Sequence, residues 1–164
     1  QLDGGAALLF ARVKGHGMPV IGNVLCCKEN CEAAFGMDYR GIRASVARAF
    51  GNPVAPERVA NAPVHEHVYR RGKDGGFDIG GMLPVLTHSD GDSGRFITAG
   101  IVVVQDPETG VYNASYHRLQ LVGAQRTAVK LDFGRHLRAA YERARRMGRP
   151  LPIAVCIGTD LAVH

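Results

Sequence analysis

The pattern of apolar and polar positions is most informative between residues 97 and 122. The apolar run 97–104 (ITAGIVVV) predicts a buried β-strand, and 106–110 (DPETG) predicts a hairpin turn, because proline fixes φ and glycine accepts a positive φ. A returning strand is expected over 111–122. Its hydrogen-bonding side chains are Asn113, Ser115, Tyr116, His117 and Arg118. Because burying such groups without partners is costly, we expect this strand to hold something polar.

Helical spacing of apolar residues predicts helices on both sides of this hairpin. Residues 39–50 follow that spacing and stop before Gly51-Asn52-Pro53, and a shorter helix over 31–35 is expected to close at Gly36. An Arg-rich helix is predicted after Gly134. Its apolar positions are Leu137, Ala140, Tyr141, Ala144 and Met147.

The remaining strands are short and lie mostly in the second half. We expect them at 18–25, 127–131 and 152–157, with a candidate at 64–69 inside a linker-like stretch, 53–81, and an extended piece at 84–86. Hairpin connections in the second half favour an antiparallel sheet or barrel with appended helices, whereas the strand followed by a helix near residue 25 is α/β-like. The predicted class is therefore α+β.

Composition limits the chain to one ordinary core, with at most a fragment of another domain, since it has 164 residues of which 46% are hydrophobic. No run of about 18 apolar residues and no signal peptide is present, so we expect a soluble, cytoplasmic protein without a membrane span.

The net charge of +5 raises the hypothesis of a nucleic-acid partner. We expect none, because no recognition motif or aromatic platform accompanies the charge. A solvated helix face explains most of the excess, which comes from Arg135, Arg138, Arg143, Arg145, Arg146 and Arg149.

Four cysteines raise the alternatives of a metal site, a disulfide or packed thiols. The spacing CCKENC, from Cys26 to Cys31, lacks the second Cys or His pair of a closed zinc site. We therefore expect small buried thiols at the end of an apolar strand and in the following helix.

Several ordered blocks of the chain resemble the UbiD family of reversible decarboxylases, which use prenylated flavin mononucleotide (prenylated FMN). The blocks are LPVLTH, GDSGRFITAG, DPETGVYNASYHRLQ and GRPLPIAVCIGTD, and GGAALLFARVKGHGMPVIGNVL and APVHEHV extend the resemblance over nearly the whole chain. The resemblance implies a mostly antiparallel split β-barrel flavin-binding domain with flanking helices over 63–164. The preceding residues 1–62 are then the end of an α/β N-terminal region and its linker. Because family members are longer, we expect this chain to be a central piece.

The same resemblance implies a bound divalent ion, typically Mn²⁺, with a nearby K⁺, which ties the flavin phosphate to the protein. The matching metal ligands are Asn113, from the NxxxxR strand, and His136, from GRHL. An amide oxygen and an imidazole nitrogen suit such an ion. The alternatives are an Asn at a strand edge and a His on a helix surface.

Cofactor contacts follow from the same match. Arg118 corresponds to the family's catalytic arginine beside the reactive part of the cofactor, where it pairs with carboxylates; its alternative is a surface cation. The other matching cofactor-binding residues are Ser115, Tyr116, His117, Lys130, Leu131, Asp132, Arg135 and His136. Asn113 and Arg118 are five residues apart, so a regular strand would point them to opposite faces, and a bulge or a strand end is required between them.

The implied activity is reversible decarboxylation of an aromatic or α,β-unsaturated carboxylic acid through a covalent adduct with prenylated FMN, in a homo-oligomer supplied by a flavin prenyltransferase. The family's third metal ligand and general acid would fall beyond His164, so we expect the segment alone to be inactive. Alternatives from other classes are a non-catalytic flavin-binding module, an accessory subunit and a flavin reductase-like protein.

Overall fold

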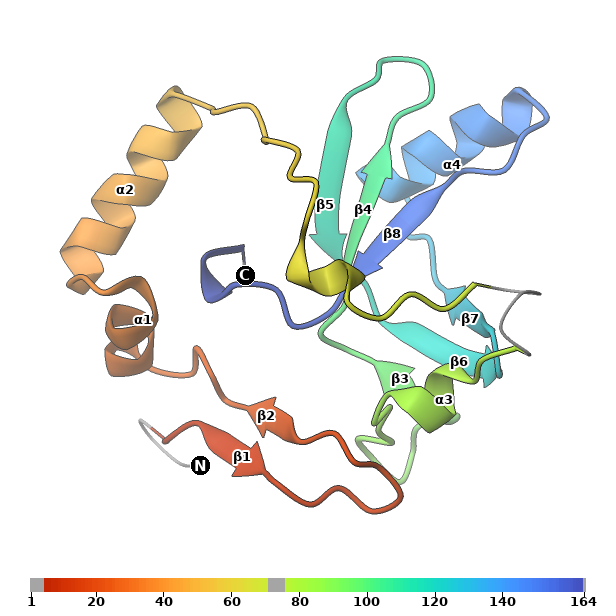
Figure 1. Cartoon of the computed structure of the whole chain (residues 1–164). Coiled ribbons are helices and arrows are strands. Elements are labelled where there is room, and N and C mark those ends of the chain that lie inside the picture. Colours follow the sequence, from red (N-terminus) through yellow and green to blue (C-terminus); the bar gives the residue numbers. More distant parts are fainter. Residues whose placement is uncertain (1–4, 71–75, 164) are drawn as a thin grey trace. The chain divides into compact units, whose positions relative to one another are not determined.

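The computed structural model describes residues 5–70 and 76–163. Contacts divide these residues into two units: the second consists of Asp78–Thr159, and the described residues outside that range form the first. Figure 1 traces both along the chain.

The first unit contains a two-stranded ribbon and two helices. β1 (Leu8–Phe10) pairs antiparallel with β2 (Val20–Gly22). α1 (Lys28–Phe35) ends at Gly36, whose φ of 62° is the left-handed conformation that closes helices. α2 (Tyr39–Gly51) begins at Asp38, whose carboxylate accepts a hydrogen bond from Gly41 N at 2.7 Å. Short 3₁₀ helices span Pro63–His65 and Leu161–Val163.

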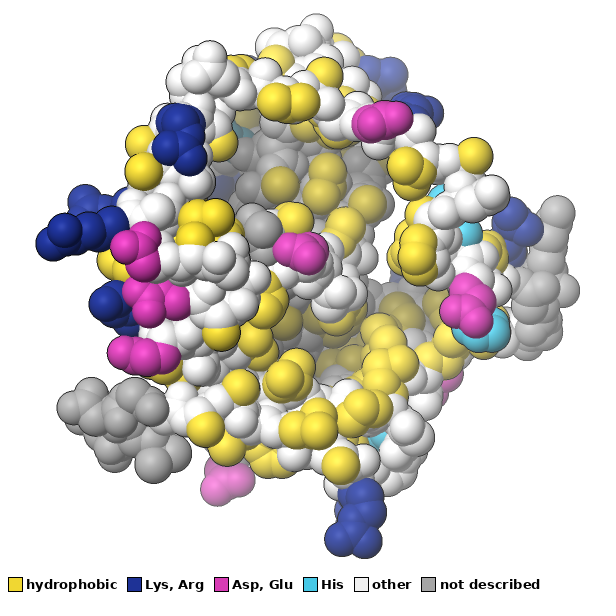
Figure 2. Space-filling view, turned by 60° about the vertical axis from the view of Figure 1, so that its left-hand side comes forward, with side chains coloured by type: hydrophobic (Ala, Val, Ile, Leu, Met, Phe, Trp, Pro, Cys, Tyr) yellow, Lys and Arg dark blue, Asp and Glu magenta, His cyan; other side chains and the backbone are white. Residues whose placement is uncertain are grey.

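Apolar side chains in the first unit remain mostly at the surface. Among its described residues, only Ile42 is a buried hydrophobic. Leu9, Ile21 and Phe50 are 66%, 57% and 86% exposed, and hydrophobic surface is widespread on the face that Figure 2 shows. A two-stranded ribbon is marginal without a packed face, so this unit contributes little core of its own.

The second unit is built on two three-stranded antiparallel sheets and a helix. One sheet has the order β3-β6-β7, with β3 at Phe96–Ile97, β6 at Leu119–Gly123 and β7 at Arg126–Val129. The other has the order β5-β4-β8, with β5 at Tyr112–Tyr116, β4 at Ile101–Gln105 and β8 at Ile153–Cys156. A one-turn helix, α3 (Ile79–Met82), precedes them, and α4 (His136–Arg146) follows β7.

The core of the second unit lies between α4 and the sheet β5-β4-β8. Leu137 and Ala140 of α4 pack against Val102 and Val104 of β4, and Leu119 of β6 completes this buried cluster. Strand alternation points Ile101 and Val103 to the opposite face of β4. The helix therefore covers one face of this sheet.

Two strands that the sequence predicts as continuous are each divided between the two sheets. The segment 97–104 breaks into β3 and β4 around Gly100, where an added Cβ would lie 3.1 Å from Val155 and 3.2 Å from Leu119. The segment 111–122 breaks into β5 and β6 at His117 and Arg118. Each of these two segments leaves one sheet and enters the other. The pattern of apolar residues alone does not reveal such a change of sheet.

Other predicted elements are confirmed or shortened. The 106–110 turn, the 39–50 helix, the Gly36 cap and the Arg-rich helix are present. The 18–25 strand is reduced to β2, the first helix starts at Lys28 rather than Cys31, and residues 64–69 contain no strand. The described strands form open sheets and no closed barrel, so the coarser description, a mixed α/β fold, is what the structure establishes.

The expectation of buried cysteines is wrong. All four cysteines are free thiols. Cys26 is exposed, whereas Cys27, Cys31 and Cys156 are half-buried. The strand predicted over 18–25 stops at Gly22, which leaves Cys26 and Cys27 ahead of α1 and Cys31 inside it, while Cys156 ends β8. Among the described residues, no helix combines the length and apolarity that crossing a membrane requires.

Candidate functional site

A chain of hydrogen bonds joins the start of α4 to β5. His136 Nδ1 lies 2.9 Å from Asn113 Oδ1, although the two residues are 23 positions apart. Asn113 Nδ2 donates to Ser115 Oγ at 3.2 Å, and Ser115 Oγ lies 3.0 Å from His117 Nε2. The structure thus brings together four of the residues that the sequence singles out.

Strand alternation explains why these side chains meet the helix. Asn113 pairs with Val104 and Ser115 with Val102, the two valines that pack on α4. Asn113 and Ser115 therefore share the helix-facing side of the sheet, while Tyr116 points to the other side. Tyr116 does not share the face of the hydrogen-bonded chain.

The spacing between Asn113 and Arg118 is accommodated by a strand end. β5 ends at Tyr116, and His117 N then donates to Gly100 O at 3.3 Å, where the backbone changes sheets. The Arg118 guanidinium lies over the Phe96 ring, 5.6 Å from its centroid. Regular β-strand pairing therefore does not extend from Asn113 to Arg118. None of the described hydrogen bonds links Arg118 to the series of hydrogen bonds that contains Asn113.

Charged residues surround the segment between β7 and α4. Lys130 Nζ and Asp132 Oδ1 form an exposed ion pair at 3.0 Å. Hydrogen bonding and charge from Lys130, followed by the charges of Arg135 and His117, lower the pKa of Asp132. Leu131 contributes its carbonyl oxygen, which accepts a hydrogen bond from Arg138 at 3.0 Å. The segment between β7 and α4 thus presents an ion pair at the surface and a backbone carbonyl bonded to α4.

The first turn of α4 has no capping side chain. Arg135 occupies the N-cap with φ −99° and ψ 147°, it forms no side-chain cap, and no acidic residue lies in the first turn. Helix N-termini carry unpaired N–H groups and a partial positive charge. An anion is therefore a suitable partner for this end of the 11-residue helix.

A cavity of about 370 Å³ lies between the β4–β5 hairpin and α4. Asn113 and His136 line it, together with Asp106 and Arg143. Asp106 and Arg143 form an ion pair, and Arg143 Nε lies 3.1 Å from Glu108 Oε2. Sequence reasoning assigned these residues only to a turn and a solvated helix face. The available signal was the helical spacing of Arg143, seven positions after His136 and hence on the same face.

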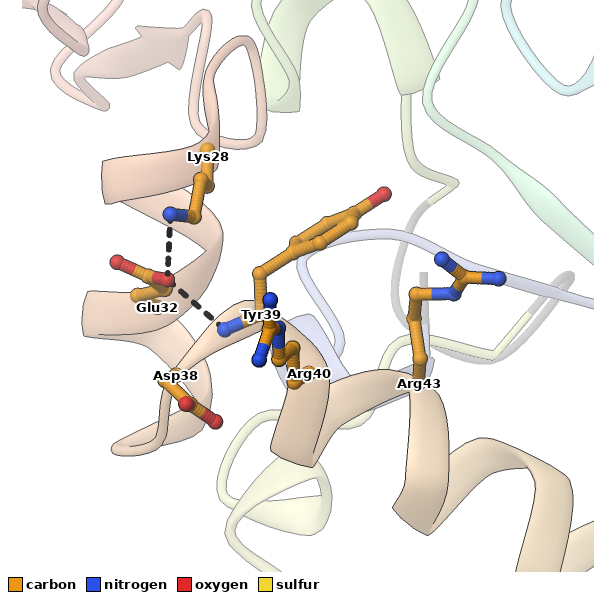
Figure 3. A pocket seen from close by; sticks show the side chains of 6 residues that line it. All are labelled: Lys28, Glu32, Asp38, Tyr39, Arg40 and Arg43. Carbon is orange, nitrogen blue, oxygen red and sulfur yellow. Dashed lines mark hydrogen bonds and ion pairs between the residues drawn. The ribbon is translucent and has the colours of Figure 1, made fainter.

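A second depression, of about 290 Å³, lies in the first unit between α1 and α2. Figure 3 shows Glu32 bonded to Lys28 and to the Tyr39 backbone, with distances of 3.4 Å and 2.8 Å. The carboxylate of Glu32 is thus already paired within the first unit. No residue proposed for the flavin site lines this depression.

The donors available for a metal ion are limited. Among the described residues, no group of three or more His, Cys, Asp or Glu side chains is arranged to hold a metal ion. Asn113 and His136 supply one amide oxygen and one imidazole nitrogen. Two ligands of an octahedral ion, each about 2.1 Å from the metal, are separated by roughly 3 Å at right angles. The observed 2.9 Å fits such a pair, which needs further ligands to complete a site.

Comparison with known proteins covers both parts of the chain. Residues 1–62 match the 3-octaprenyl-4-hydroxybenzoate carboxy-lyase N-terminal domain, and residues 57–164 match the Rift-related domain of the same carboxy-lyases. The structure of the UbiD-class enzyme HmfF from Pelotomaculum thermopropionicum, in an evolved dimeric form with prFMN (prenylated FMN), is similar with a TM-score of 0.84. That similarity has 40% identity over 94% of this chain and 35% of the HmfF chain.

Curated relatives agree with this match. Gallate decarboxylase of Lactiplantibacillus plantarum is 31% identical over 97% of this chain and 33% of its own length. Anhydromevalonate phosphate decarboxylase of Methanothermobacter thermautotrophicus is 32% identical over 94% of this chain and 34% of its length. The chain spans about a third of the length of such relatives. It belongs to the UbiD family of 3-octaprenyl-4-hydroxybenzoate carboxy-lyases.

Proposed function

We propose that this chain is the cofactor-docking part of a prenylated-FMN-dependent decarboxylase. The complete protein would release CO2 reversibly from an aromatic or α,β-unsaturated carboxylic acid. HmfF was solved with prenylated FMN, and the curated relatives include decarboxylases. The observation that carries the proposal is the 2.9 Å contact between Asn113 Oδ1 and His136 Nδ1, the two residues that match the family's metal ligands.

In this proposal Asn113 and His136 hold a divalent ion, Mn²⁺, with K⁺ nearby. Their 2.9 Å separation, one-oxygen-one-nitrogen chemistry and shared cavity support a common ion. The fold alone brings the two side chains into contact, which supports a pair preorganised for ion binding.

The phosphate of the cofactor would lie at the uncapped start of α4. Free N–H groups of the first turn, with Lys130 and Arg135 nearby, offset its two negative charges. Asn113 and His136, the first residue of α4, would hold the divalent ion at this same end of the helix. Ser115, Tyr116, His117, Leu131 and Asp132 would complete the contacts, with Tyr116 using its backbone because its side chain faces away.

When bound, prenylated FMN supplies the electron sink for carbon–carbon bond cleavage. Arg118 would lie beside the reactive part of the cofactor. Its planar guanidinium can donate paired hydrogen bonds to a carboxylate and so fix the orientation of that carboxylate. The Phe96 ring beneath it limits the positions that the guanidinium can adopt. The role of this chain is thus to bind and orient.

Proton delivery would come from residues outside this segment. No described polar or charged side chain is fully buried, and the pKa shifts resolved for the carboxylates of Glu29, Asp106 and Asp132 are all downward. A carboxylic general acid needs a raised pKa to remain protonated near neutral pH. This supports inactivity of the segment alone, and with it the alternative that the chain serves as a flavin-binding module or accessory subunit.

Finer features of the architecture belong to the same proposal. The two three-stranded sheets of the second unit would be parts of a split barrel, since two stretches of chain pass from one sheet to the other. The complete protein would be cytoplasmic, act as a homo-oligomer, as the dimeric form of HmfF suggests, and receive its cofactor from a flavin prenyltransferase.

Mn²⁺ binding to the complete protein tests the ligand pair. Electron paramagnetic resonance of free Mn²⁺ gives the affinity of the wild type, of Asn113→Ala and of His136→Ala. Each substitution is expected to weaken binding at least about 100-fold, because a direct ligand is lost. His88→Ala is the matched control, since His88 lies in an exposed loop and contacts Thr98. Wild-type affinity in both ligand variants contradicts the assignment.

A further inference from the structure

A second set of contacts joins the β4–β5 hairpin to α4. Asp106 Oδ1 accepts hydrogen bonds from the backbone N–H groups of Glu108 and Thr109 at 3.0 and 3.1 Å, which close the turn. Its other oxygen, Oδ2, pairs with Arg143, 37 residues away. Arg143 also reaches Glu108 Oε2 through Nε at 3.1 Å. One guanidinium therefore holds both acidic residues of the turn.

These contacts lie on the same face of α4 as the proposed metal ligand. Arg143 follows His136 by seven residues, two helical turns, which places them roughly 10 Å apart along the helix axis. Ala139 and Ala140 lie between them and line the same cavity. On the hairpin, Asp106 and Asn113 line that cavity too. The helix is thus attached to the hairpin by polar contacts at two points on one face.

Apolar packing also holds α4 on the sheet, through Leu137 and Ala140 against the valines of β4. Such packing is non-directional. A guanidinium bonded to two carboxylates is directional, because its planar N–H groups have fixed positions. The side chains of Arg143 and Asp106 are only 32% and 13% exposed, so water screens this pair less than a surface pair.

Neighbouring contacts to the turn are weaker candidates for this role. Arg146 reaches Glu108 at 3.5 Å with a side chain that is 63% exposed. The Arg149 side chain donates to the carbonyl oxygen of Pro107, at 3.2 Å, and to no carboxylate among the described contacts. Arg143 alone among these residues combines two carboxylate partners with partial burial.

We propose that Arg143, held by Asp106, is a positioning residue for the Asn113–His136 pair. This inference rests on the proposed function, because it concerns the divalent ion that the pair would bind. The ion pair fixes the rotation of α4 against the hairpin and so keeps Nδ1 of His136 within reach of the ion that Asn113 binds. Metal ligands must be held to within about 0.5 Å of their productive positions, so loss of the guanidinium weakens ion binding without removing a ligand.

The test measures Mn²⁺ affinity on the complete protein without its flavin, again by electron paramagnetic resonance. Arg143→Met is expected to weaken Mn²⁺ binding about tenfold, within the range for supporting residues of metal sites. Asp106→Asn is expected to have a similar effect, and the double variant to be no weaker than the worse single variant, because both substitutions break one contact. Asp106→Asn also serves as the test if Arg143→Met does not fold.

Two controls separate positioning from general stability. Arg145→Met removes an arginine of the same helix that pairs only with Glu142 in the described contacts, and wild-type affinity is expected. Ile101→Ala destabilises the core from the sheet face opposite α4, and it too is expected to keep its Mn²⁺ affinity below its unfolding temperature.

The outcomes distinguish this inference from the proposal beneath it. If Arg143→Met and Asp106→Asn bind Mn²⁺ like the wild type while His136→Ala does not, the positioning role is wrong and the metal site stands. If Ile101→Ala weakens binding as much as Arg143→Met at equal loss of stability, the effect is general and the positioning role is again wrong. If His136→Ala and Asn113→Ala both bind normally, the metal site itself is wrong.

Discussion

The imidazole of His136 meets the amide of Asn113 across 23 residues of chain, with 2.9 Å between Nδ1 and Oδ1. The contact joins the first residue of α4 to the second residue of β5, where Asn113 pairs with Val104. The side chains of His136 and Asn113 therefore project from a regular helix and a regular strand, respectively. A ligand that replaces the hydrogen bond needs little rearrangement of either element.

The orientation of the Asn113 amide depends on Ser115. Because Ser115 Oγ accepts from Asn113 Nδ2, its own proton is directed to His117 Nε2. His117 is thus expected to carry its proton on Nδ1, which long-range ¹H–¹⁵N NMR of the complete protein without metal reports directly. An Nε2–H tautomer contradicts this account of the chain of hydrogen bonds.

Replacing Ser115 by Ala tests the same chain through metal affinity. The amide of Asn113 loses the acceptor that keeps its oxygen turned toward His136, so Mn²⁺ binding is expected to weaken about tenfold. Ser93→Ala is a matched control, because that hydroxyl bonds only to Gln120 in the described part of the chain. Equal affinities for Ser115→Ala and the wild type would show that the amide needs no such support.

Arg118 is expected to require its guanidinium rather than only its charge. Arg118→Lys loses the planar set of donors, so kcat of the complete enzyme is expected to fall about 100-fold while flavin absorbance shows that the cofactor is retained. Arg126→Lys, on the exposed strand β7, is the control. Full turnover by Arg118→Lys would exclude a catalytic role for the guanidinium geometry.

The Asp106 carboxylate is expected to make stability depend on pH. Hydrogen bonding from Thr109 N–H, and further contacts with Glu108 and Arg143, lower the pKa of Asp106 from its ordinary value of 3.8. A lowered carboxylate pKa stabilises the fold fully above the ordinary value, and this contribution is lost as the pH falls through the lowered value. The difference in thermal midpoint between the wild type and Asp106→Asn should therefore shrink between pH 6 and pH 3. A difference that does not change with pH contradicts the linkage; Asp90→Asn, in an exposed loop, provides the baseline.

Gly100 tests the junction between the two sheets. An added methyl group would meet Val155, Leu119 and Ile97 at 3.1 to 3.3 Å, so Gly100→Ala is expected to lower the free energy of unfolding by about 1–3 kcal/mol. Gly123→Ala is the control, since its nearest neighbour would be Arg126 at an ordinary 3.7 Å. Urea unfolding of the complete protein measures both. Equal stability of the two variants would show that the junction tolerates a side chain.

Local chemistry made the hairpin and the helices predictable. Pro107 and Gly110 identify the turn, Gly36 identifies the end of α1, and apolar spacing identifies α2 and α4. The division of two long strands was missed, because Gly100 is compatible with an uninterrupted strand and the residues around His117 continue the β pattern. Which sheet a strand joins depends on packing between residues distant in sequence.

The candidate site was only partly visible in the sequence. Resemblance to a family pointed to Asn113 and His136, and the structure brings these two side chains into contact. The ion pair of Asp106 with Arg143 was missed, because a turn aspartate and a helix arginine have common local explanations. Only the fold shows that they meet across 37 residues.

Native mass spectrometry of the complete protein, expressed with a flavin prenyltransferase, tests the central claim most directly. We predict a mass that includes prenylated FMN and Mn²⁺ in the wild type, loss of the metal in His136→Ala, and retention of both in His88→Ala. A wild-type protein that carries unmodified flavin without a divalent ion, or no flavin at all, would contradict the claim and favour a binding module or accessory subunit.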